Sequence, residues 1–452
     1  MTNNLHPILT KLGIDQLNAM QQEAYEAIAH SDRDVVILSP TGTGKTLAYL
    51  LPLTERLDAS LDEVQAIVVV PGRELAMQSA EVLKSMGAGL RACACYGGRM
   101  AMDEHRTLRQ VRPHIVFGTP GRLNDHLDKG NISAAHVRFV VIDEFDKCLE
   151  MGFLKEMAQL MKTFPAAGRR NLLLSATEAE QIPQFVRMGR TERVDYRIDD
   201  EQVSERVQIY QVRSPQKDKL QPLCRLLLSF GEQSSIVFLN YRDSVERVGN
   251  FLRQQGFAVS IFHGGLEQRQ REDALYRFVN GSVNVLVCTD LASRGLDIPD
   301  VANIVHYHLP ETEQNYVHRV GRTARWDKQG RAFFLLNAEE RVPDYVTAGQ
   351  PEGVDLIDYA LPTESEVAQL KPAQPRMVTL YIGKGKRDKL SRGDIVGFLC
   401  KKGGLQGSDI GKISVEERFT YVAVARDRFR QLLRQIQGEK IKGVKTIFEE
   451  VR

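Results

Sequence analysis

The sequence predicts an α/β protein with two tandem doubly wound parallel-sheet lobes, followed by a small α+β domain of ferredoxin-like order. Short apolar runs rich in β-branched residues recur between amphipathic stretches, as expected for strands buried on both faces of a parallel sheet. These runs fall into two sets of five, separated near residues 195–205. The last 77 residues follow a different alternation of strands and helices. Together, these three observations define the predicted fold class.

The two sets of apolar runs place one lobe in residues 1–200 and a second in residues 201–350. The strands predicted for the first lobe are Val35–Leu38, Ala66–Val70, Ile115–Phe117, Phe139–Ile142 and Leu172–Leu174. Those predicted for the second are Ile236–Leu239, Ala258–Phe262, Val283–Val287, Ile304–Val305 and Ala332–Leu336. Residues 351–375 contain four prolines, which indicates a linker.

Residues 376–452 predict a separate domain of β-α-β-β-α-β order. Its last helix has Phe429, Leu432, Leu433 and Ile436 at i, i+3, i+4 and i+7, which gives one apolar face. The other expected elements are a strand at Val378–Ile382, a helix at Asp394–Cys400, a strand pair at Ile413–Val415 and Tyr421–Val424, and a closing strand at Val444–Phe448.

Composition excludes several classes of protein. The 452 residues are 42% hydrophobic and 26% charged, unlike a disordered tail protein, a collagen-like fibre or a disulfide-rich miniature scaffold. No apolar run approaches the ~18 residues of a membrane-spanning helix, and the first residues do not resemble a signal peptide. The six cysteines show no Cys-x-x-Cys spacing. We therefore expect free thiols and a cytoplasmic location.

Charge is distributed unevenly along the chain. The whole chain carries 60 basic and 58 acidic residues, a net charge of +2. Residues 376–452 hold 18 Lys and Arg against 9 Asp and Glu, so that domain carries +9 and the rest −7. A basic domain on a mildly acidic body predicts an anionic partner. The alternative is an ordinary solvated basic surface.

The strongest local signal is a glycine-rich loop between a predicted strand and a predicted helix. It comprises Ser39, Pro40, Thr41, Gly42, Thr43, Gly44, Lys45 and Thr46. Backbone N–H groups in such a loop surround phosphate oxygens, a lysine reaches the β- and γ-phosphates, and a threonine hydroxyl binds Mg²⁺. The motif therefore predicts a nucleotide site, with Lys45 on the phosphates and Thr46 on the metal.

A second nucleotide-binding element follows the strand Phe139–Ile142. Asp143 ends the strand, where its carboxylate can hold Mg²⁺, and Glu144 can orient and deprotonate the attacking water. Acidic clusters at strand ends are often only solvated turns. The phosphate loop earlier in the chain makes the catalytic interpretation the stronger one.

Together with further motifs in order, these residues resemble the DEAD-box RNA helicases over almost the full length of the chain. The first-lobe motifs are Pro71–Ala76, Gly97–Gly98, Thr119–Arg122 and Ser175–Thr177, and the second-lobe motifs are His263–Arg271, Thr289–Asp290, Arg294–Asp297 and His318–Arg325. The resemblance implies two RecA-like lobes, ATP and Mg²⁺ as cofactors, and RNA as partner.

The resemblance also implies roles for individual residues. Catalysis would use Lys45, Asp143, Glu144 and the arginine fingers Arg322 and Arg325, which offer planar donors to the transferring phosphoryl group. Gln21 would read adenine and Asp297 the ribose, and Asp146, Ser175 and Thr177 would couple hydrolysis to unwinding. The implied RNA-facing residues of the lobes are Arg73, Gly98, Thr119, Gly121, Arg122, Gln268, Arg271, Thr289 and Arg294.

Two departures from the family pattern affect these expectations. Position 145 is Phe where the family usually has Ala, and its ring must find space beside Ser175–Thr177. Leu17, Asn18 and Met20 replace the Pro, Thr and Ile usual before the adenine-reading glutamine. Coupling and strict selection of ATP are therefore less firmly predicted than nucleotide binding.

The C-terminal domain resembles the RNA-binding domain of DbpA-type helicases, through Thr379–Lys384, Arg392–Ile395, Ile410–Ile413, Tyr421–Val424 and Lys440–Gly443. That resemblance implies a hairpin of large-subunit (23S) ribosomal RNA as ligand and a role in ribosome assembly on precursor particles. Tyr381, Phe419 and Tyr421 occupy positions of stacking aromatics, although aromatic side chains in small sheets are as often core residues. The candidate RNA-binding cations are Lys384, Lys386, Lys412, Lys440 and Lys442.

The leading hypothesis is an RNA-stimulated ATPase, acting as a monomer, that separates short RNA duplexes. A second is an ATP-gated RNA clamp or chaperone with little unwinding, for which Phe145 is the only support. A third is a DNA translocase, which Thr119–Arg122 and the C-terminal domain disfavour.

Overall fold

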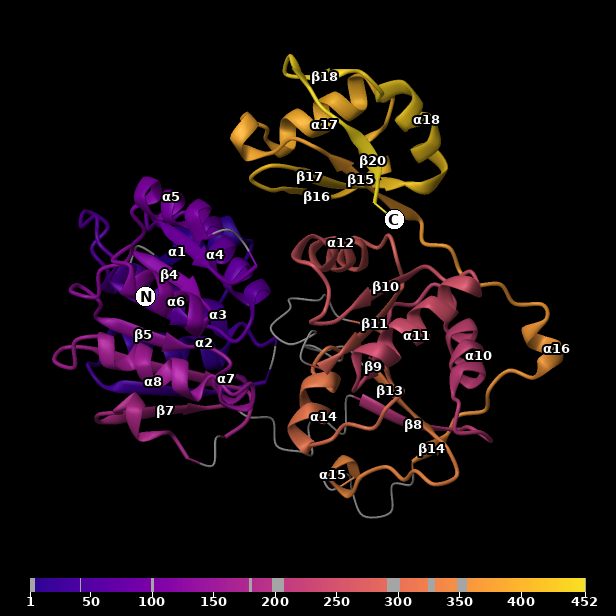
Figure 1. Ribbon diagram of the computed structural model, residues 1–452, viewed down its shortest axis with the longest axis horizontal. Helices are drawn as coiled ribbons and strands as arrows, with labels where there is room; N and C mark the ends of the chain where they lie inside the picture. The colour runs from indigo at the N-terminus through magenta and orange to yellow at the C-terminus, as the bar shows by residue number, and fades with distance from the viewer. Residues whose placement is uncertain are drawn as a thin grey trace. The chain divides into compact units, whose positions relative to one another are not determined.

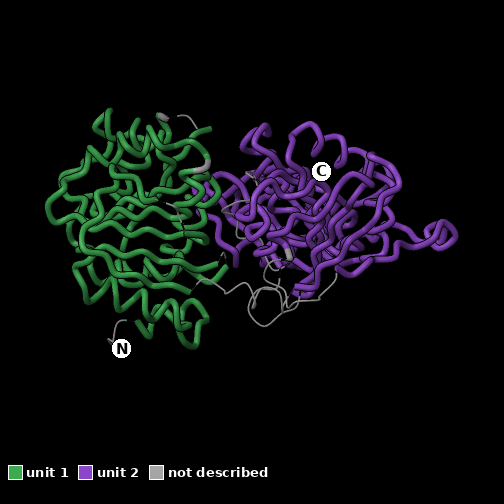
Figure 2. The backbone as a smooth tube through the Cα atoms, turned by 90° about the horizontal axis from the view of Figure 1, so that it is seen from below, with its two compact units in different colours: residues 1–203, 294–297 green, residues 204–293, 298–452 purple. Residues whose placement is uncertain are grey.

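The computed structural model describes residues 5–40, 42–98, 101–178, 181–196, 207–290, 301–323, 330–347 and 356–451. The chain divides into two compact units (Figure 2). Among the described residues, the first unit ends at Tyr196 and the second begins at Val207. No described helix has the length and apolar character needed to cross a membrane.

The first unit is built on a seven-stranded parallel sheet of order β3-β4-β2-β5-β6-β1-β7 (Figure 1). The strands are β1 Asp34–Leu38, β2 Ala66–Val69, β3 Ala92–Cys95, β4 Ile115–Gly118, β5 Phe139–Ile142, β6 Arg170–Ser175 and β7 Thr191–Asp195. The helices are α1 Leu5–Leu12, α2 Ala19–Ala29, α3 Lys45–Arg56, α4 Arg73–Met86, α5 Ala101–Val111, α6 Pro120–Asp128, α7 Phe145–Glu150, α8 Leu154–Thr163 and the 3₁₀ turn η1 Gln184–Val186.

Alternate residues of the first sheet enter two separate cores. Val68 and Val141 pack with residues of α1–α4, while Ile67 and Val140 pack with residues of α5–α8. Because successive strand side chains point to opposite faces, this division means that helices cover both faces of the sheet. That arrangement explains why the strand sequences are continuously apolar.

The second unit contains another seven-stranded parallel sheet, of order β10-β11-β9-β12-β13-β8-β14. Its strands are β8 Val207–Arg213, β9 Ser235–Leu239, β10 Val259–Phe262, β11 Val285–Thr289, β12 Asn303–His306, β13 Gly330–Leu336 and β14 Ile357–Asp358. Its helices are α10 Leu220–Phe230, α11 Arg242–Gln254, α12 Gln268–Val279, α14 Glu313–Val320, α15 Asp344–Thr347 and α16 Glu364–Val367. The strand β14 and the helix α16 fall within the expected linker.

All ten predicted lobe strands are present, and the described residues contain four further lobe strands that the sequence did not predict. Edge strand β3 is made of Ala and Cys, and β7 reads Thr-Glu-Arg-Val-Asp, so neither shows a run of β-branched apolar residues. β8 alternates between buried and partly exposed positions, and β14 has only two exposed residues. Three of these four lie at sheet edges, where burial on both faces is incomplete.

The C-terminal part of the second unit forms a four-stranded antiparallel sheet of order β16-β17-β15-β20. Its strands are β15 Met377–Ile382, β16 Ile410–Val415, β17 Thr420–Ala425 and β20 Phe448–Glu450. Its helices are α17 Arg392–Lys401 and α18 Arg426–Ile436, with 3₁₀ turns η2 Lys386–Asp388 and η3 Gly407–Asp409. The predicted fold class is therefore confirmed, because this domain follows two parallel α/β sheets.

The expected closing strand at Val444–Phe448 is wrong in its position. Val444–Lys445 (β19) pairs with Lys440–Ile441 (β18) in a separate two-stranded hairpin. Phe448–Glu450 closes the sheet by pairing with β15. The apolar pattern identified Val444 and Phe448 correctly as partly or fully buried, but it could not show that a hairpin separates them.

Candidate functional site

The phosphate loop follows β1 and leads into α3. Gly42 and Gly44 have φ of 87° and 86°, backbone conformations that side chains with a Cβ rarely adopt. A Cβ on Gly44 would also lie 2.3 Å from Nε2 of Gln21. The positive φ of the turn therefore favours glycine at position 44, and any larger residue would also displace the Gln21 side chain.

The loop is held by its own side chains. Lys45, buried at the start of α3, donates hydrogen bonds to the carbonyl oxygens of Ser39 and Pro40, the latter at 2.8 Å. The Ser39 hydroxyl donates to the Thr43 hydroxyl at 2.7 Å, and Thr43 donates to the Pro40 carbonyl at 2.9 Å. A bound phosphate would take over the Lys45 ammonium from these carbonyls, while Thr46 follows in the first turn of α3.

The start of α2 is tied to the phosphate loop. The Gln21 Oε1 accepts from the Asn18 backbone N–H at 3.1 Å, and its Nε2 donates to the Gly44 carbonyl at 3.3 Å. Asn18 caps α2 and donates from Nδ2 to the Thr43 carbonyl at 3.0 Å. Sequence reasoning treated Asn18 only as a departure from the family, whereas it is a second anchor of the loop.

Asp143 and Glu144 lie at the carboxyl end of β5. Asp143 is buried, and its Oδ1 accepts from the Glu144 backbone N–H at 2.9 Å. Glu144 has φ 50° and ψ 52°, a left-handed conformation uncommon for a residue with a side chain and typical of functional sites. Burial and the neighbouring Glu144 raise the pKa of Asp143 to about 7, against the opposing effect of Lys45.

These residues fit a hard divalent cation. A buried carboxylate next to a second carboxylate is costly to ionise, and a cation would remove that cost. Asp143 offers a carboxylate oxygen and Thr46 a hydroxyl oxygen, the oxygen donors that Mg²⁺ prefers. The donor set therefore suits Mg²⁺ bound together with substrate phosphates.

The three residues predicted to couple hydrolysis to unwinding are joined by hydrogen bonds in the first unit. The Thr177 hydroxyl donates to Asp146 Oδ2 at 2.8 Å, and the Ser175 hydroxyl donates to the Thr177 carbonyl at 2.6 Å. The Phe145 ring does not displace them, because it is buried in the core formed with Ile142 and Leu173. The bulky side chain at position 145 is thus accommodated in the core, away from the Asp146–Thr177 bond.

The expected RNA-facing residues of the first lobe lie at the carboxyl ends of three adjacent strands. Gly98 follows β3, Thr119 to Arg122 follow β4, and Arg73 follows β2, in the sheet order β3-β4-β2. The residues predicted for the nucleotide site follow β5 and β1, and those predicted for coupling end or follow β6 and β5, in the other half of the sheet. The Arg73 guanidinium lies against Gly98, where a Cβ would meet Nη1 at 2.4 Å.

Glu104 on α5 organises this region and was missed by sequence reasoning. Its buried carboxylate accepts from the Tyr96 backbone N–H at 3.1 Å, lies 2.9 Å from His126 Nε2 and pairs with Arg122 Nε at 3.2 Å. Cys95 Sγ lies in the same cluster. Burial raises the pKa of Cys95, which disfavours a metal-binding thiolate, so the cluster is best explained as the support of Arg122.

In the second lobe, the predicted residues follow the strands at the corresponding edge. Gln268 and Arg271 begin α12 after β10, and Thr289 ends β11. Arg271 lies over the Phe262 ring at 5.1 Å, and Gln268 Nε2 donates to Glu272 at 3.0 Å. These residues lie at the carboxyl ends of the neighbouring strands β10 and β11.

Arg322, a predicted finger, is buried after α14, and the preceding turn is fixed by Arg319. Arg319 donates from Nε and Nη2 to both oxygens of Asp290, each at 2.6 Å, and from Nη1 to the His308 carbonyl at 2.7 Å. Arg319 thus holds α14 to the ends of β11 and β12. Of the other predicted site residues, Thr41, Arg294, Asp297 and Arg325 lie outside the described residues.

The predicted cations of the C-terminal domain lie in two loops and on β16. Lys384 pairs with Asp388 at 3.0 Å, and Lys442 pairs with Asp394 at 2.8 Å. Lys442 also donates to the Lys389 carbonyl at 3.0 Å, which brings the loops 384–391 and 440–445 together. The remaining predicted cations are Lys386, which is half-buried, and Lys412 and Lys440, which are exposed.

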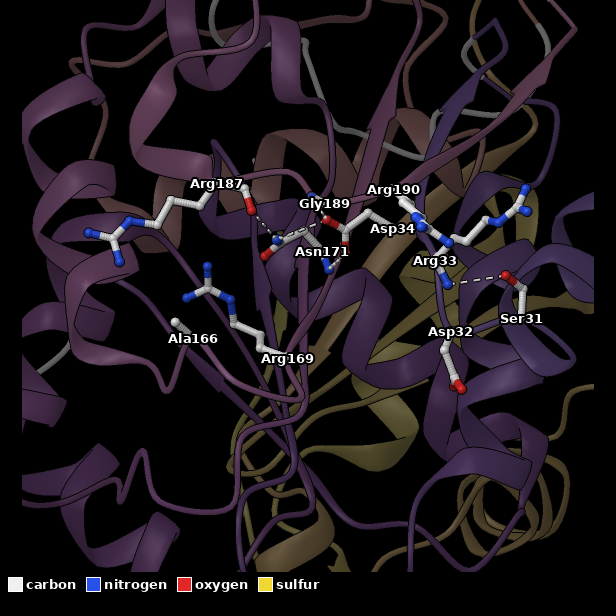
Figure 3. A pocket seen from close by; sticks show the side chains of 10 residues that line it. All are labelled: Ser31, Asp32, Arg33, Asp34, Ala166, Arg169, Asn171, Arg187, Gly189 and Arg190. Carbon is white, nitrogen blue, oxygen red and sulfur yellow. Dashed lines mark hydrogen bonds between the residues drawn. The ribbon is translucent and has the colours of Figure 1, made fainter.

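A cavity of about 580 Å³ lies elsewhere in the first unit (Figure 3). Asp34 begins β1 and Asn171 lies near the start of β6, so this cavity lies at the amino ends of strands whose carboxyl ends carry the nucleotide site. Asp34 accepts from the backbone N–H groups of Asn171 and Gly189, at 2.7 and 2.6 Å. Asp34 thus joins the segment before β7 to the start of β6, on the opposite side of the sheet from the predicted nucleotide site.

Comparison with known proteins agrees with this geometry. Family models match residues 18–185 (DEAD/DEAH box helicase), 218–327 (helicase conserved C-terminal domain) and 379–450 (DbpA RNA binding domain). ATP-dependent RNA helicase DbpA of Escherichia coli (strain K12) is 37% identical over 96% of this chain and 94% of that protein. The protein of the same name from Bacillus subtilis (strain 168) is 29% identical, with 96% and 95% covered.

Solved structures give the same fold. The DEAD-box helicase Mss116 bound to ssRNA and UDP-BeF matches with a TM-score of 0.72 at 25% identity, covering 82% of this chain and 80% of that one. This chain thus combines the phosphate loop, the Asp143–Glu144 pair and the C-terminal sheet domain. The two DbpA relatives match it over 96% of its length. The chain belongs to the DEAD-box ATP-dependent RNA helicases that carry a DbpA RNA-binding domain.

Proposed function

We propose that this helicase unwinds short RNA duplexes in large-subunit (23S) ribosomal RNA, during assembly of the ribosomal large subunit, using ATP with Mg²⁺. The observation that carries the enzymatic part is the buried Asp143–Glu144 pair, whose Asp143 carboxyl lies within the electrostatic influence of Lys45 of the phosphate loop. The targeting part rests on the +9 charge of residues 376–452 and on their match to the DbpA RNA-binding domain.

In this proposal, Lys45 and the loop backbone hold the phosphates, Thr46 and Asp143 hold Mg²⁺, and Glu144 orients and deprotonates the attacking water. Bound Mg²⁺ would neutralise charge on the β- and γ-phosphate oxygens. Arg322 and Arg325 donate to the transferring phosphoryl group, Gln21 selects adenine and Asp297 contacts the ribose. Asp146, Ser175 and Thr177 transmit the state of the nucleotide to the RNA-facing residues.

The proposed division of labour places catalysis in residues 1–350 and targeting in residues 376–452. The lobes' RNA-facing residues follow strand ends and favour contacts with the phosphate backbone, which carry no sequence information. Selectivity therefore needs the C-terminal domain, and we propose its cations as the ribosomal RNA contacts. The six cysteines are free thiols, which supports a reducing, cytoplasmic compartment.

Removal of residues 376–452 tests this division. The truncated chain should keep an ATPase that any RNA stimulates weakly, whereas the full chain should respond preferentially to ribosomal RNA. Replacing Lys384, Lys386 and Lys412 together by Ala should reduce the salt dependence of RNA binding, because fewer counterions are released. Undiminished preference of the truncated chain for ribosomal RNA over a homopolymer would place targeting in the lobes.

The alternative of an ATP-gated clamp loses its sequence support. Its only basis was Phe145, and that ring packs in the core while the Thr177–Asp146 hydrogen bond at 2.8 Å is intact. The experiment that separates the two functions is strand separation of a short RNA duplex under ATP turnover. A clamp would hydrolyse ATP slowly and release no strand.

A further inference from the structure

The cavity at the amino ends of β1 and β6 is lined mostly by charged and polar side chains (Figure 3). Its volume of about 580 Å³ falls within the range of small-molecule sites, about 300–1,000 Å³. Four arginines and two aspartates contribute to the lining: Arg33, Arg169, Arg187, Arg190, Asp32 and Asp34. Four positive groups less two negative ones leave a net charge of +2. The cavity is therefore suited to an anion.

The two carboxylates of the lining are engaged with other groups. Asp34 accepts from the backbone N–H groups of Asn171 and Gly189, at 2.7 and 2.6 Å. Asp32 pairs with Arg56, which lies outside the lining, at 2.6 Å. Among the described residues, none of the four lining arginines forms an ion pair. Their guanidinium groups are thus left to interact with an anion from solution.

Arg169 is the lining arginine whose charge is least well compensated. Its Nη1 donates to the Met161 carbonyl at 3.1 Å and its Nη2 to the Val186 carbonyl at 3.4 Å. Its Nε–H is buried and has no hydrogen-bond partner among the described residues. Burial lowers the pKa of Arg169, Asp34 opposes that effect and Arg187 adds to it. Because an arginine stays protonated, a bound anion would offset both the burial and the repulsion from Arg187.

Asn171 adds an unsatisfied acceptor to the lining. The residue is 2% exposed, and its Nδ2 donates to Asp34 Oδ2 and to the Arg187 carbonyl, both at 3.4 Å. Because both partners of Nδ2 are acceptors, the orientation of the amide is fixed and Oδ1 needs a donor. This oxygen has no partner among the described residues, and Figure 3 shows it turned toward Arg169. A buried acceptor without a donor is costly, so the lining favours a ligand that also carries hydroxyl groups.

The cavity is separate from the predicted nucleotide site. Asp34 begins β1, and the phosphate loop begins at Ser39, five residues later. At about 3.3 Å per residue, these two positions are about 17 Å apart along the strand. The residues predicted to face RNA also follow the carboxyl ends of their strands. A ligand in the cavity would therefore lie outside both predicted sites.

We propose that this cavity binds the phosphate monoester group of a small sugar phosphate. A phosphate monoester carries a charge of about −1.5 to −2 at pH 7, which matches the +2 of the lining, whereas a carboxylate carries a single charge. Arg187 and Arg190 are exposed, and their planar guanidinium groups suit paired hydrogen bonds to phosphate oxygens. Arg169 turns onto the same group, which uncovers Asn171 Oδ1 for a sugar hydroxyl.

Calorimetric titration of the full chain with ribose 5-phosphate tests the proposal. Ribose 5-phosphate should bind, whereas ribose, which lacks the phosphate, should not. One site for ribose 5-phosphate should remain in the Lys45→Ala variant, because the phosphate loop is not part of the cavity. Absence of binding to the native chain, or complete loss of binding in Lys45→Ala, would overturn the proposal.

Replacement of two exposed lining arginines tests where the sugar phosphate binds. Arg187→Gln with Arg190→Gln should lower its affinity by about tenfold or more, because charged hydrogen bonds are lost. Both side chains are exposed, so this variant should melt at the temperature of the native chain. Arg106→Gln with Arg109→Gln, on exposed positions of α5 outside the cavity, removes the same charge and should keep native affinity. An equal loss in both double variants, or a loss in neither, would overturn the proposal.

A phosphorylated 5′ end of RNA carries the same chemical group, so the source of the phosphate is tested separately. The full chain should bind a short single-stranded RNA equally well with a 5′-phosphate or a 5′-hydroxyl, because the predicted RNA-facing residues lie at the other end of the strands. Tighter binding of the 5′-phosphorylated RNA that Arg187→Gln with Arg190→Gln removes would make an RNA end the ligand, and would overturn the small sugar phosphate.

Discussion

Replacing Glu104 by Gln should lower both the stability of the first lobe and its affinity for RNA. The Glu104 carboxylate serves three partners, the Tyr96 backbone N–H, His126 Nε2 and Arg122 Nε, at 3.1, 2.9 and 3.2 Å. A glutamine amide can keep one accepting oxygen, but its NH₂ group must then face the Arg122 donor. The substitution therefore removes the buried carboxylate from a largely buried guanidinium and leaves it the longer contact to Asp125, at 3.6 Å.

The size of the effect follows from the burial of the pair. The side chains of Glu104 and Arg122 are 6% and 15% exposed. Breaking a buried ion pair by removing one partner costs about 3–5 kcal/mol. For a unit of this size, 1 kcal/mol lowers the melting temperature by about 2–4 °C, so the first lobe should melt roughly 10 °C lower. Loss of one well-placed charged contact should weaken RNA binding about tenfold.

Thermal unfolding and an RNA titration of ATPase activity measure the two effects. Asp125→Asn is the matched control, because Asp125 is the other carboxylate near Arg122, at 3.6 Å, but is 31% exposed. An exposed pair contributes about 0–1 kcal/mol, so this variant should resemble the native chain in both assays. If Glu104→Gln also resembles the native chain, Glu104 does not support Arg122 and the reasoning is refuted.

Three further predictions concern the nucleotide site. Glu144→Gln should retain ATP binding but abolish turnover and trap the ATP-bound state on RNA, measured by RNA dissociation; near-normal turnover would exclude Glu144 as the base. Arg325→Ala should lower RNA-stimulated kcat by about 10³-fold with little change in ATP affinity, and reduced affinity with intact turnover of bound ATP would contradict the role of a finger. Asp143→Asn should abolish hydrolysis yet stabilise the nucleotide-free protein at pH 8. The folded-state pKa of Asp143, about 7, exceeds that of an unfolded Asp, so ionisation of this carboxylate costs stability increasingly as pH rises from about 4 to 7. The gain in Tm should therefore be larger at pH 8 than at pH 5, and equal gains would contradict the raised pKa.

The sequence predicted the fold class well because parallel strands buried on both faces read as continuous apolar runs. It failed where that condition fails, as in β3 and β7 at the edges of the first sheet. It also misplaced the last strand, because the apolar residues Val444 and Phe448 belong to different elements. Val444 lies in a hairpin, whereas Phe448 lies in the strand that closes the sheet.

Site residues could be predicted where their signal is local in the sequence, and were missed where their partners are distant in the chain. The phosphate loop and the Asp143–Glu144 pair are local motifs with a strand before each, so their neighbourhood could be inferred. Glu104 gave no local signal, because its partners Tyr96 and Arg122 meet it only through folding. The strand position of Tyr421 suggested a residue that stacks on RNA bases. Its hydroxyl instead contacts Asp273, which is 148 residues away in the chain and so could not be inferred from the local sequence.

The most direct measurement of the central claim is ATPase activity of the full chain titrated with large-subunit ribosomal RNA, and with a homopolymer RNA and DNA of equal nucleotide concentration. We predict strong stimulation by ribosomal RNA with half-saturation at least tenfold lower than for the homopolymer, and none by DNA. The chain lacking residues 376–452 should lose that difference while retaining a weak response to both RNAs. Equal stimulation of the full chain by ribosomal RNA and homopolymer, or comparable stimulation by DNA, would contradict an RNA helicase targeted by its C-terminal domain.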